Sequence, residues 1–169
     1  ISSEMKTDAI KAIIIATICM LIYIRLRFKQ MSFASSAVIA LVHDVLIVLA
    51  FYALARTSVG TTFIACMLTI VGYSINATIV IFDRVRESLR TRVRNQSLAE
   101  LVNESVTDTL SRSIFTSLTT FFMVLTLFIF GVASVKEFAL PIMIGIICGA
   151  YSSVCLAGSI WYVLRKKAD

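Results

Sequence analysis

Proline occurs once in this chain of 169 residues and charged residues make up only 15% of it, whereas 59% of the residues are hydrophobic. The mean hydropathy of +0.92 is far above that of water-soluble domains. The composition therefore excludes a disordered chain and argues strongly against a soluble domain. Cys19, Cys66, Cys148 and Cys155 all lie in apolar segments without metal-ligand spacing, so they are interpreted as small core residues, with neither disulfide nor metal.

Long stretches without charge predict helices that cross a membrane. Four of them exceed the roughly 20 residues that a helix needs to span a bilayer, and only His43 and Asp44 interrupt any of the four. A fifth candidate has Lys11 near one end, where the ammonium group can reach the interface. We predict an all-α membrane protein in which residues 1–8 end an extracytoplasmic region and residues 9–169 form the transmembrane domain. The predicted spans are about 9–26, 33–54, 59–82, 112–135 and 138–164.

Basic residues gather in the segments on one side of these predicted spans. That side carries Arg25, Arg27, Lys29, Arg84, Arg86, Arg90, Arg92, Arg94, Arg165, Lys166 and Lys167, and the other side only Lys6, Lys11, Arg56 and Lys136. By the positive-inside rule, the N-terminus lies outside and the C-terminus lies in the cytoplasm of a bacterial cell. The basic residues are predicted to face anionic lipid and not nucleic acid.

The longest predicted loop, about 83–109 on the cytoplasmic side, contains a helical pattern. Its apolar residues on one face are Leu98, Leu101, Val102, Val106 and Leu110. We therefore predict an amphipathic helix at the cytoplasmic interface.

Small residues recur at every fourth position of the last predicted span. They are Gly145, Gly149, Ser153 and Ala157. Such a stripe lets another helix approach closely, as a sliding contact or as static packing, and we favour static packing.

Two ionisable residues lie at the middle of the second predicted span. Because a carboxylate at this depth is costly, Asp44 must be protonated or paired. It either carries a coupling ion or is tied to the backbone or hydroxyl groups of an adjacent helix, and we favour the second interpretation. His43 is a proton-relay candidate, but a histidine in such a position is more often a satisfied core residue.

Two further relay candidates, Ser74 and Asn76, form a polar patch in the third span that suits a neighbouring helix or water. Hydroxyl and amide groups can pass a proton on through water but cannot hold one. Arg112, which opens the fourth span near the cytoplasmic edge, either has a structural role or acts as a permanent charge on a carboxylate of another helix. In the structural role it snorkels to the interface or pairs with Asp108 one turn earlier. No nucleophile–base pair or phosphate loop indicates an enzyme.

Several segments resemble one family. The sequence GYSINATIVIFDRVRE at residues 72–87 is similar to the motif GYSINDTVVIFDRIRE of the SecF family. LVHDVLI, LVNESVTDTLSRSIFTSLTT, LFIFG and GIICGAYSS are similar to further SecF motifs in the same order. The resemblance covers nearly the whole chain and implies the transmembrane half of an RND-superfamily protein. It implies a fragment with family spans two to six, without the first span and the periplasmic domain.

The resemblance also implies a function. SecF works with SecD to promote release of exported preproteins from a SecYEG-type channel, and it draws on the proton gradient, or on sodium in some members. No cofactor other than this coupling ion is implied. The ion relay of the family falls on Arg112 and on an aspartate at the position of Ala77. Because alanine cannot be protonated, this half of the relay is lost or moved to Asp44 or to SecD. The alternative function is a scaffold subunit that binds SecD and the channel without moving ions.

Overall fold

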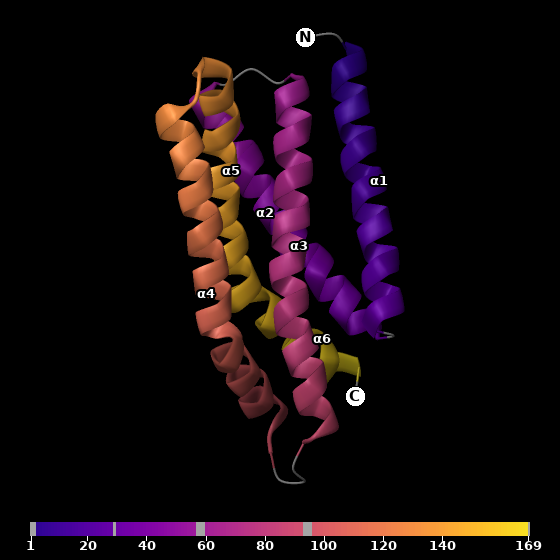
Figure 1. Cartoon of the computed structure of the whole chain (residues 1–169). Helices are drawn as coiled ribbons and strands as arrows, with labels where there is room; N and C mark the ends of the chain where they lie inside the picture. Colours follow the sequence, from indigo (N-terminus) through magenta and orange to yellow (C-terminus); the bar gives the residue numbers. More distant parts are fainter. Residues whose placement is uncertain (1–2, 29, 57–59, 93–95, 169) are drawn as a thin grey trace.

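All regular structure in the computed structural model is helical over the residues that it describes, 3–28, 30–56, 60–92 and 96–168. The elements are α1 (Ser3–Phe28), α2 (Met31–Ala55), α3 (Thr61–Arg90), α4 (Leu98–Phe130), α5 (Ala133–Tyr151), a π-helical segment η1 (Ser152–Ala157) and α6 (Gly158–Ala168). The long helices form an elongated bundle with the chain termini toward opposite ends (Figure 1). Helix α3 is central, because it packs against α1, α2, α4, α5 and η1.

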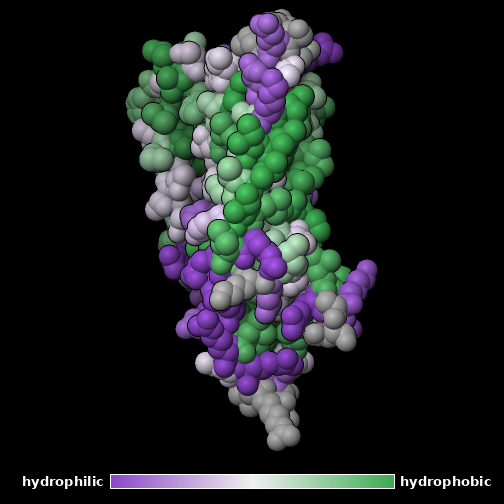
Figure 2. Space-filling model, turned by 90° about the vertical axis from the view of Figure 1, so that its right-hand side faces the viewer, coloured by the Kyte–Doolittle hydropathy of each residue, from purple (hydrophilic) through white to green (hydrophobic). Residues whose placement is uncertain are grey.

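The surface of the bundle has the character of a membrane protein. Figure 2 shows a broad hydrophobic region on one face, with hydrophilic residues concentrated toward the lower end. Four helices are long and apolar enough to cross a membrane: α2, α3, α4 and the continuous helical stretch from Ala133 to Lys167. Within the described residues, the expected fifth span, α1, is a helix of 26 residues but is not among these four candidates. Lys11, Arg25 and Arg27 confine its apolar stretch to the middle.

Helices α3 and α4 extend further into the predicted loop than their apolar stretches indicated. Helix α3 continues to Arg90, and α4 begins at Leu98 and continues to Phe130. The amphipathic segment is therefore the first part of α4 and not a separate interfacial helix. Its apolar face is covered by protein, since Leu101 and Val102 are buried in the same core cluster as Phe82.

The start of α4 is specified by its local sequence. Ser97 Oγ accepts a hydrogen bond from the backbone N–H of Glu100 at 3.1 Å, and Ser97 N–H donates one to Glu100 Oε2 at 3.0 Å. This capping box satisfies two groups that the first helical turn leaves without partners. The side chains of the two helices also meet across the hairpin, where Ser105 Oγ donates to Ser88 Oγ at 2.9 Å.

An aromatic cluster joins four helices near the C-terminal end of the bundle. Phe33 of α2 stacks on Trp161 of α6 with ring centroids 4.9 Å apart, and it meets Phe82 of α3 and Phe28 of α1 at 5.1 Å each. All four side chains are buried. Close aromatic contacts add to the apolar area that these large side chains bury, so this cluster anchors α1 and α6 to the central helices.

Candidate functional site

Asp44 on α2 is completely buried and accepts hydrogen bonds from two other elements. Ser74 Oγ of α3 donates to Asp44 Oδ2 at 2.5 Å, and Ser152 Oγ of η1 donates to the same oxygen at 2.6 Å. His43 Nδ1 lies 3.0 Å from Asp44 Oδ1 and donates to it when Nδ1 carries the proton. These bonds offset the cost of removing the carboxylate from water and join α2, α3 and η1 through one side chain.

Glycines allow the helix that leads to Ser152 to approach α3 closely. A Cβ atom added at Gly145 would lie 2.5 Å from Ile70 Cγ1, and one at Gly149 would lie 3.5 Å from the Cα of Ser74. Ser153 and Ala157, which continue the stripe, are also buried. The stripe therefore lies in a helix–helix contact, directly beside the hydroxyl groups that reach Asp44.

A second polar location is a small pocket of about 30 Å³ between α3 and α4. Its lining residues are Tyr73, Asn76, Ala77, Val80, Arg112, Ser113, Thr116 and Ser117. The Tyr73 hydroxyl donates a hydrogen bond to Ser117 Oγ at 2.7 Å and so joins the two helices. Ser113 Oγ is buried and has no hydrogen-bond partner among the described residues.

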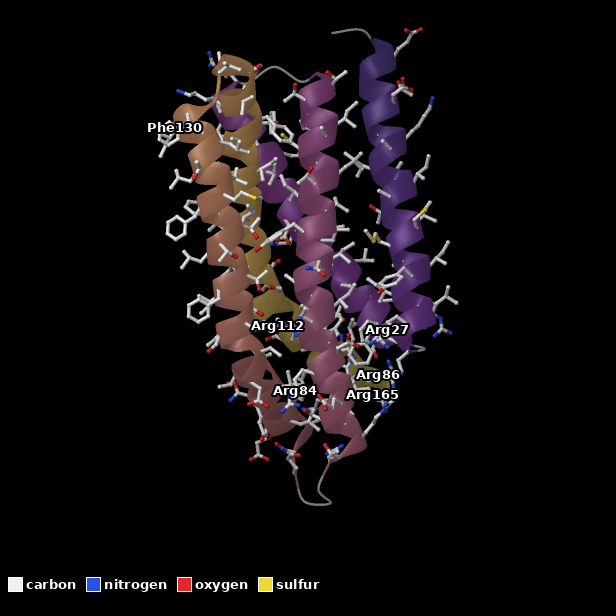
Figure 3. The ribbon with its side chains drawn as sticks, in the orientation of Figure 1. Arg27, Arg84, Arg86, Arg112, Phe130 and Arg165 are labelled. Carbon is white, nitrogen blue, oxygen red and sulfur yellow. The ribbon has the colours of Figure 1, made fainter. Side chains whose placement is uncertain are left out.

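Arg112 extends into the region between α3 and α4, above Arg84 in Figure 3. One of the two expected interpretations paired it with Asp108, and this pairing is wrong in the structure. Asp108 Oδ2 lies 2.5 Å from Arg84 Nη2, and Arg84 also binds Glu87. Across the part of the chain that the structure describes, the Arg112 side chain has no recorded ion pair or hydrogen bond.

The candidates from the sequence therefore divide between two locations. Asp44, His43 and Ser74 share one hydrogen-bonded cluster, whereas Asn76, Ala77 and Arg112 line the pocket. None of the recorded hydrogen bonds or ion pairs of the described residues joins the two locations. Sequence reasoning placed Ser74 and Asn76 in one polar patch, but α3 presents them to different neighbours.

Two serines with a part in these locations were not among the predicted site residues. Ser152 donates to Asp44, and Ser113 lines the pocket beside Arg112. The adjacent serines at 152 and 153, within an apolar span, were the available signal for the first. The second had none, because Ser113 belongs to a stretch in which serine and threonine are frequent.

The arginines at the C-terminal end of the bundle make contacts between helices. Arg27 of α1 lies 3.1 Å from Asp83 of α3, and Arg86 Nη1 donates to the backbone carbonyl of Arg27 at 3.2 Å. Both guanidinium groups lie about 6 Å from the ring centre of Phe28. Figure 3 labels Arg27, Arg86 and Arg165 toward this end of the bundle. Part of the basic charge thus also holds the helices together.

Comparison with known proteins identifies the family. The profile of the family described as "Protein export membrane protein SecD/SecF, C-terminal" matches residues 1–167. The chain belongs to the SecD/SecF family. It is 42% identical to the protein translocase subunit SecF of Calditerrivibrio nitroreducens over 167 residues, which cover 98% of this chain and 55% of that protein. It is 41% identical to the protein translocase subunit SecDF of Bacillus subtilis over 99% of this chain and 23% of that one.

The fold agrees with a solved structure of the same family. A crystal structure of SecDF in the super-membrane-facing form superposes with a TM-score of 0.89 at 38% sequence identity, over 99% of this chain and 23% of that chain. The resemblance inferred from the motifs is thus confirmed. The chain spans about half the length of the SecF relative and about a quarter of the SecDF relatives.

Proposed function

We propose that this chain is the membrane-embedded part of an auxiliary subunit of the Sec protein translocase, which promotes export of preproteins through a SecYEG-type channel. The observation that carries the proposal is the family match over residues 1–167, together with relatives named as translocase subunits at about 40% identity.

A SecD-type protein is the proposed partner in the membrane. In the Bacillus subtilis relative, named SecDF, a similar segment is part of one longer chain. Helix α4 supports the same conclusion, because only 11% of the residues in its most apolar stretch are buried within the bundle. Arg112 of α4 and Asn76 of the neighbouring α3 are also exposed, and polar groups within a bilayer favour protein or water over lipid. The SecD-type subunit covers this face in the proposed assembly.

The proposed topology has five spans, with the N-terminus outside and the C-terminus in the cytoplasm of a bacterial cell. The 26 residues of α1 correspond to about 39 Å at about 1.5 Å per residue, which exceeds the roughly 30 Å of a bilayer core. Ile14, Ile18 and Ile22 on this helix are at least half exposed, as expected for side chains that face lipid. The basic residues at the opposite end would then face anionic lipid in the cytoplasmic leaflet.

The proton-motive force is the proposed energy source, with Arg112 as the permanent charge of the relay. Arg112 and Ala77 line the same pocket, which supports the correspondence with the arginine and aspartate of the family motif. Because Ala77 cannot bind a proton, the carboxylate that titrates against Arg112 comes from the SecD-type partner in this proposal. Asp44 is the other candidate, but its three hydrogen-bonding neighbours favour a structural role.

A scaffold without ion transport is the second candidate function. Ala77 favours it directly, because the pocket holds an arginine but no carboxylate. In that case the chain binds SecD and the channel, and the energy of the ion gradient enters elsewhere.

Export measured in membrane vesicles with and without a proton gradient distinguishes these functions. In a full-length subunit assembled with SecD, Arg112→Ala should remove gradient-dependent export, whereas Arg112→Lys should retain part of it. Lys136→Gln, which removes an exposed charge away from the pocket, is the matched control. If both Arg112 variants export like the wild type, the relay role of Arg112 is wrong and the scaffold remains.

Two further variants locate the carboxylate. Ala77→Asp should raise gradient-dependent export if position 77 is a disabled relay, and leave it unchanged if the partner supplies the carboxylate. Asp44→Asn should weaken co-purification with SecD if Asp44 is structural. Loss of ion coupling in an intact complex would instead make Asp44 the carrier.

A further inference from the structure

The pocket between α3 and α4 is rich in hydrogen-bond donors. The guanidinium group of Arg112 has five N–H donors and stays charged at any physiological pH. Ser117 Oγ accepts from Tyr73, so its own hydrogen is available to another group. Asn76 adds an amide at the rim. Taken together, these groups offer hydrogens and positive charge to whatever occupies the pocket.

Ser113 is independent support for an occupant. Its side chain is only 9% exposed, it lines the pocket, and its hydroxyl oxygen has no hydrogen-bond partner among the described residues. A buried hydroxyl without a partner loses the hydrogen bonds that it made in water, and native structures seldom leave that loss uncompensated. An acceptor that enters the pocket would satisfy this hydroxyl group.

No acidic side chain lines the pocket to balance Arg112. Among the described residues, the lining contains one arginine and no aspartate or glutamate, and Ala77 contributes only a methyl group. The acidic residue one turn before Arg112, Asp108, binds Arg84 instead. Arg112 has no recorded counter-charge in the described part of the chain, so a charged acceptor gains more here than a neutral one.

The size of the pocket limits the occupant to a single small species. About 30 Å³ is enough for a water molecule or one monatomic ion. Water can satisfy Ser113 but leaves the charge of Arg112 unbalanced. We propose that, when no partner carboxylate is bound at Arg112, this pocket binds one small monovalent anion of the chloride type, held by Arg112, Ser113 and Ser117, which takes the place of a carboxylate at position 77.

Binding of chloride to the purified chain in zwitterionic detergent tests the proposal without any export assay. Broadening of the ³⁵Cl resonance reports exchange of chloride with a protein site, and unlabelled bromide should compete for it whereas gluconate should not. We expect saturable broadening with the wild-type chain that falls several-fold in Arg112→Gln and in Ala77→Asp. Lys136→Gln removes one charge elsewhere and should leave the broadening unchanged.

A second measurement covers variants that fold poorly. Ser113→Ala keeps the charge of Arg112, and it should weaken chloride binding while leaving unfolding in gluconate unchanged. Unfolding is followed through Trp161, the only tryptophan, which is buried away from the pocket in the aromatic cluster. Equal thermal midpoints of the wild type in chloride and gluconate at matched ionic strength, or broadening that persists in Arg112→Gln, would overturn the proposal and leave water in the pocket. Because these tests use no translocase, they can fail while the proposed export function holds, and the reverse.

Discussion

Replacing Gly145 by alanine should weaken the contact between α3 and α5. The new Cβ would lie 2.5, 2.7 and 2.9 Å from three side-chain atoms of Ile70, which itself is 1% exposed and cannot move into open space. Carbon atoms pack best at about 3.5–4.0 Å, so the two helices must separate or Ile70 must leave its preferred rotamer. Overpacking of this kind costs about 1–3 kcal/mol. Alanine regains about 0.5–1 kcal/mol of helix propensity, which leaves a net destabilisation of about 1 kcal/mol at the middle of both ranges and of about 2.5 kcal/mol at most.

Unfolding in mixed micelles with increasing sodium dodecyl sulfate, followed by the fluorescence of Trp161, measures this change. Gly72→Ala is the matched control, because a Cβ at Gly72 in α3 meets no atom within 4 Å and should only gain helix propensity. The Gly145→Ala substitution should also lose its effect in an Ile70→Ala background, since the clashing atoms are then absent. Equal or higher stability of Gly145→Ala relative to the wild type would refute the close contact.

Three further substitutions test other parts of the structure. Ser97→Ala removes the capping box and should cost about 1 kcal/mol, seen as faster amide hydrogen exchange in the first turns of α4; unchanged exchange would contradict the cap. Phe33→Ala should cost about 3–5 kcal/mol and shift the fluorescence of its stacking partner, whereas the exposed Phe130→Ala should change detergent unfolding little; equal effects would contradict the aromatic core. Tyr73→Phe removes the hydrogen bond to Ser117 and should cost about 1 kcal/mol in the same assay, and no loss would mean that the bond adds nothing to stability.

The sequence predicted the helices better than their contacts. Charge-free length located α2, α3 and the final helical stretch, because each must present apolar side chains to lipid or core along its whole length. The ends of α3 and α4 were harder to predict from the sequence. Periodicity identified the apolar face that contains Leu101 and Val102, but it does not tell whether lipid or Phe82 covers that face. Only the packing of the two helices against each other decided this.

For the polar residues as well, the sequence predicted the need for partners better than it predicted the partners. That Asp44 needs partners follows from its depth in an apolar segment, and the preferred interpretation, hydroxyl groups of adjacent helices, agrees with the structure. The identity of these partners did not follow, because Ser152 is 108 residues away in the sequence. For Arg112, a partner one turn away was considered, yet Asp108 binds a residue of another helix. Helical spacing within one segment carries no information about competition from a neighbouring helix.

The π-helical segment between α5 and α6 sets the direction in which the side chains of α6 point around the helix axis. A π-helical turn holds one residue more than an α-helical turn, so removing one residue from Ser152–Ala157 would rotate α6 by about 100° relative to α5. Trp161 would then turn away from Phe33, even though Ser152 could still meet Asp44. Phe33 and Asp44 are eleven residues apart on α2 and so lie about 20° apart around that helix. The extra residue thus helps a single helix reach the same face of α2 with both its serine and its tryptophan. A one-residue deletion there would be far more harmful than any single substitution in the same six residues.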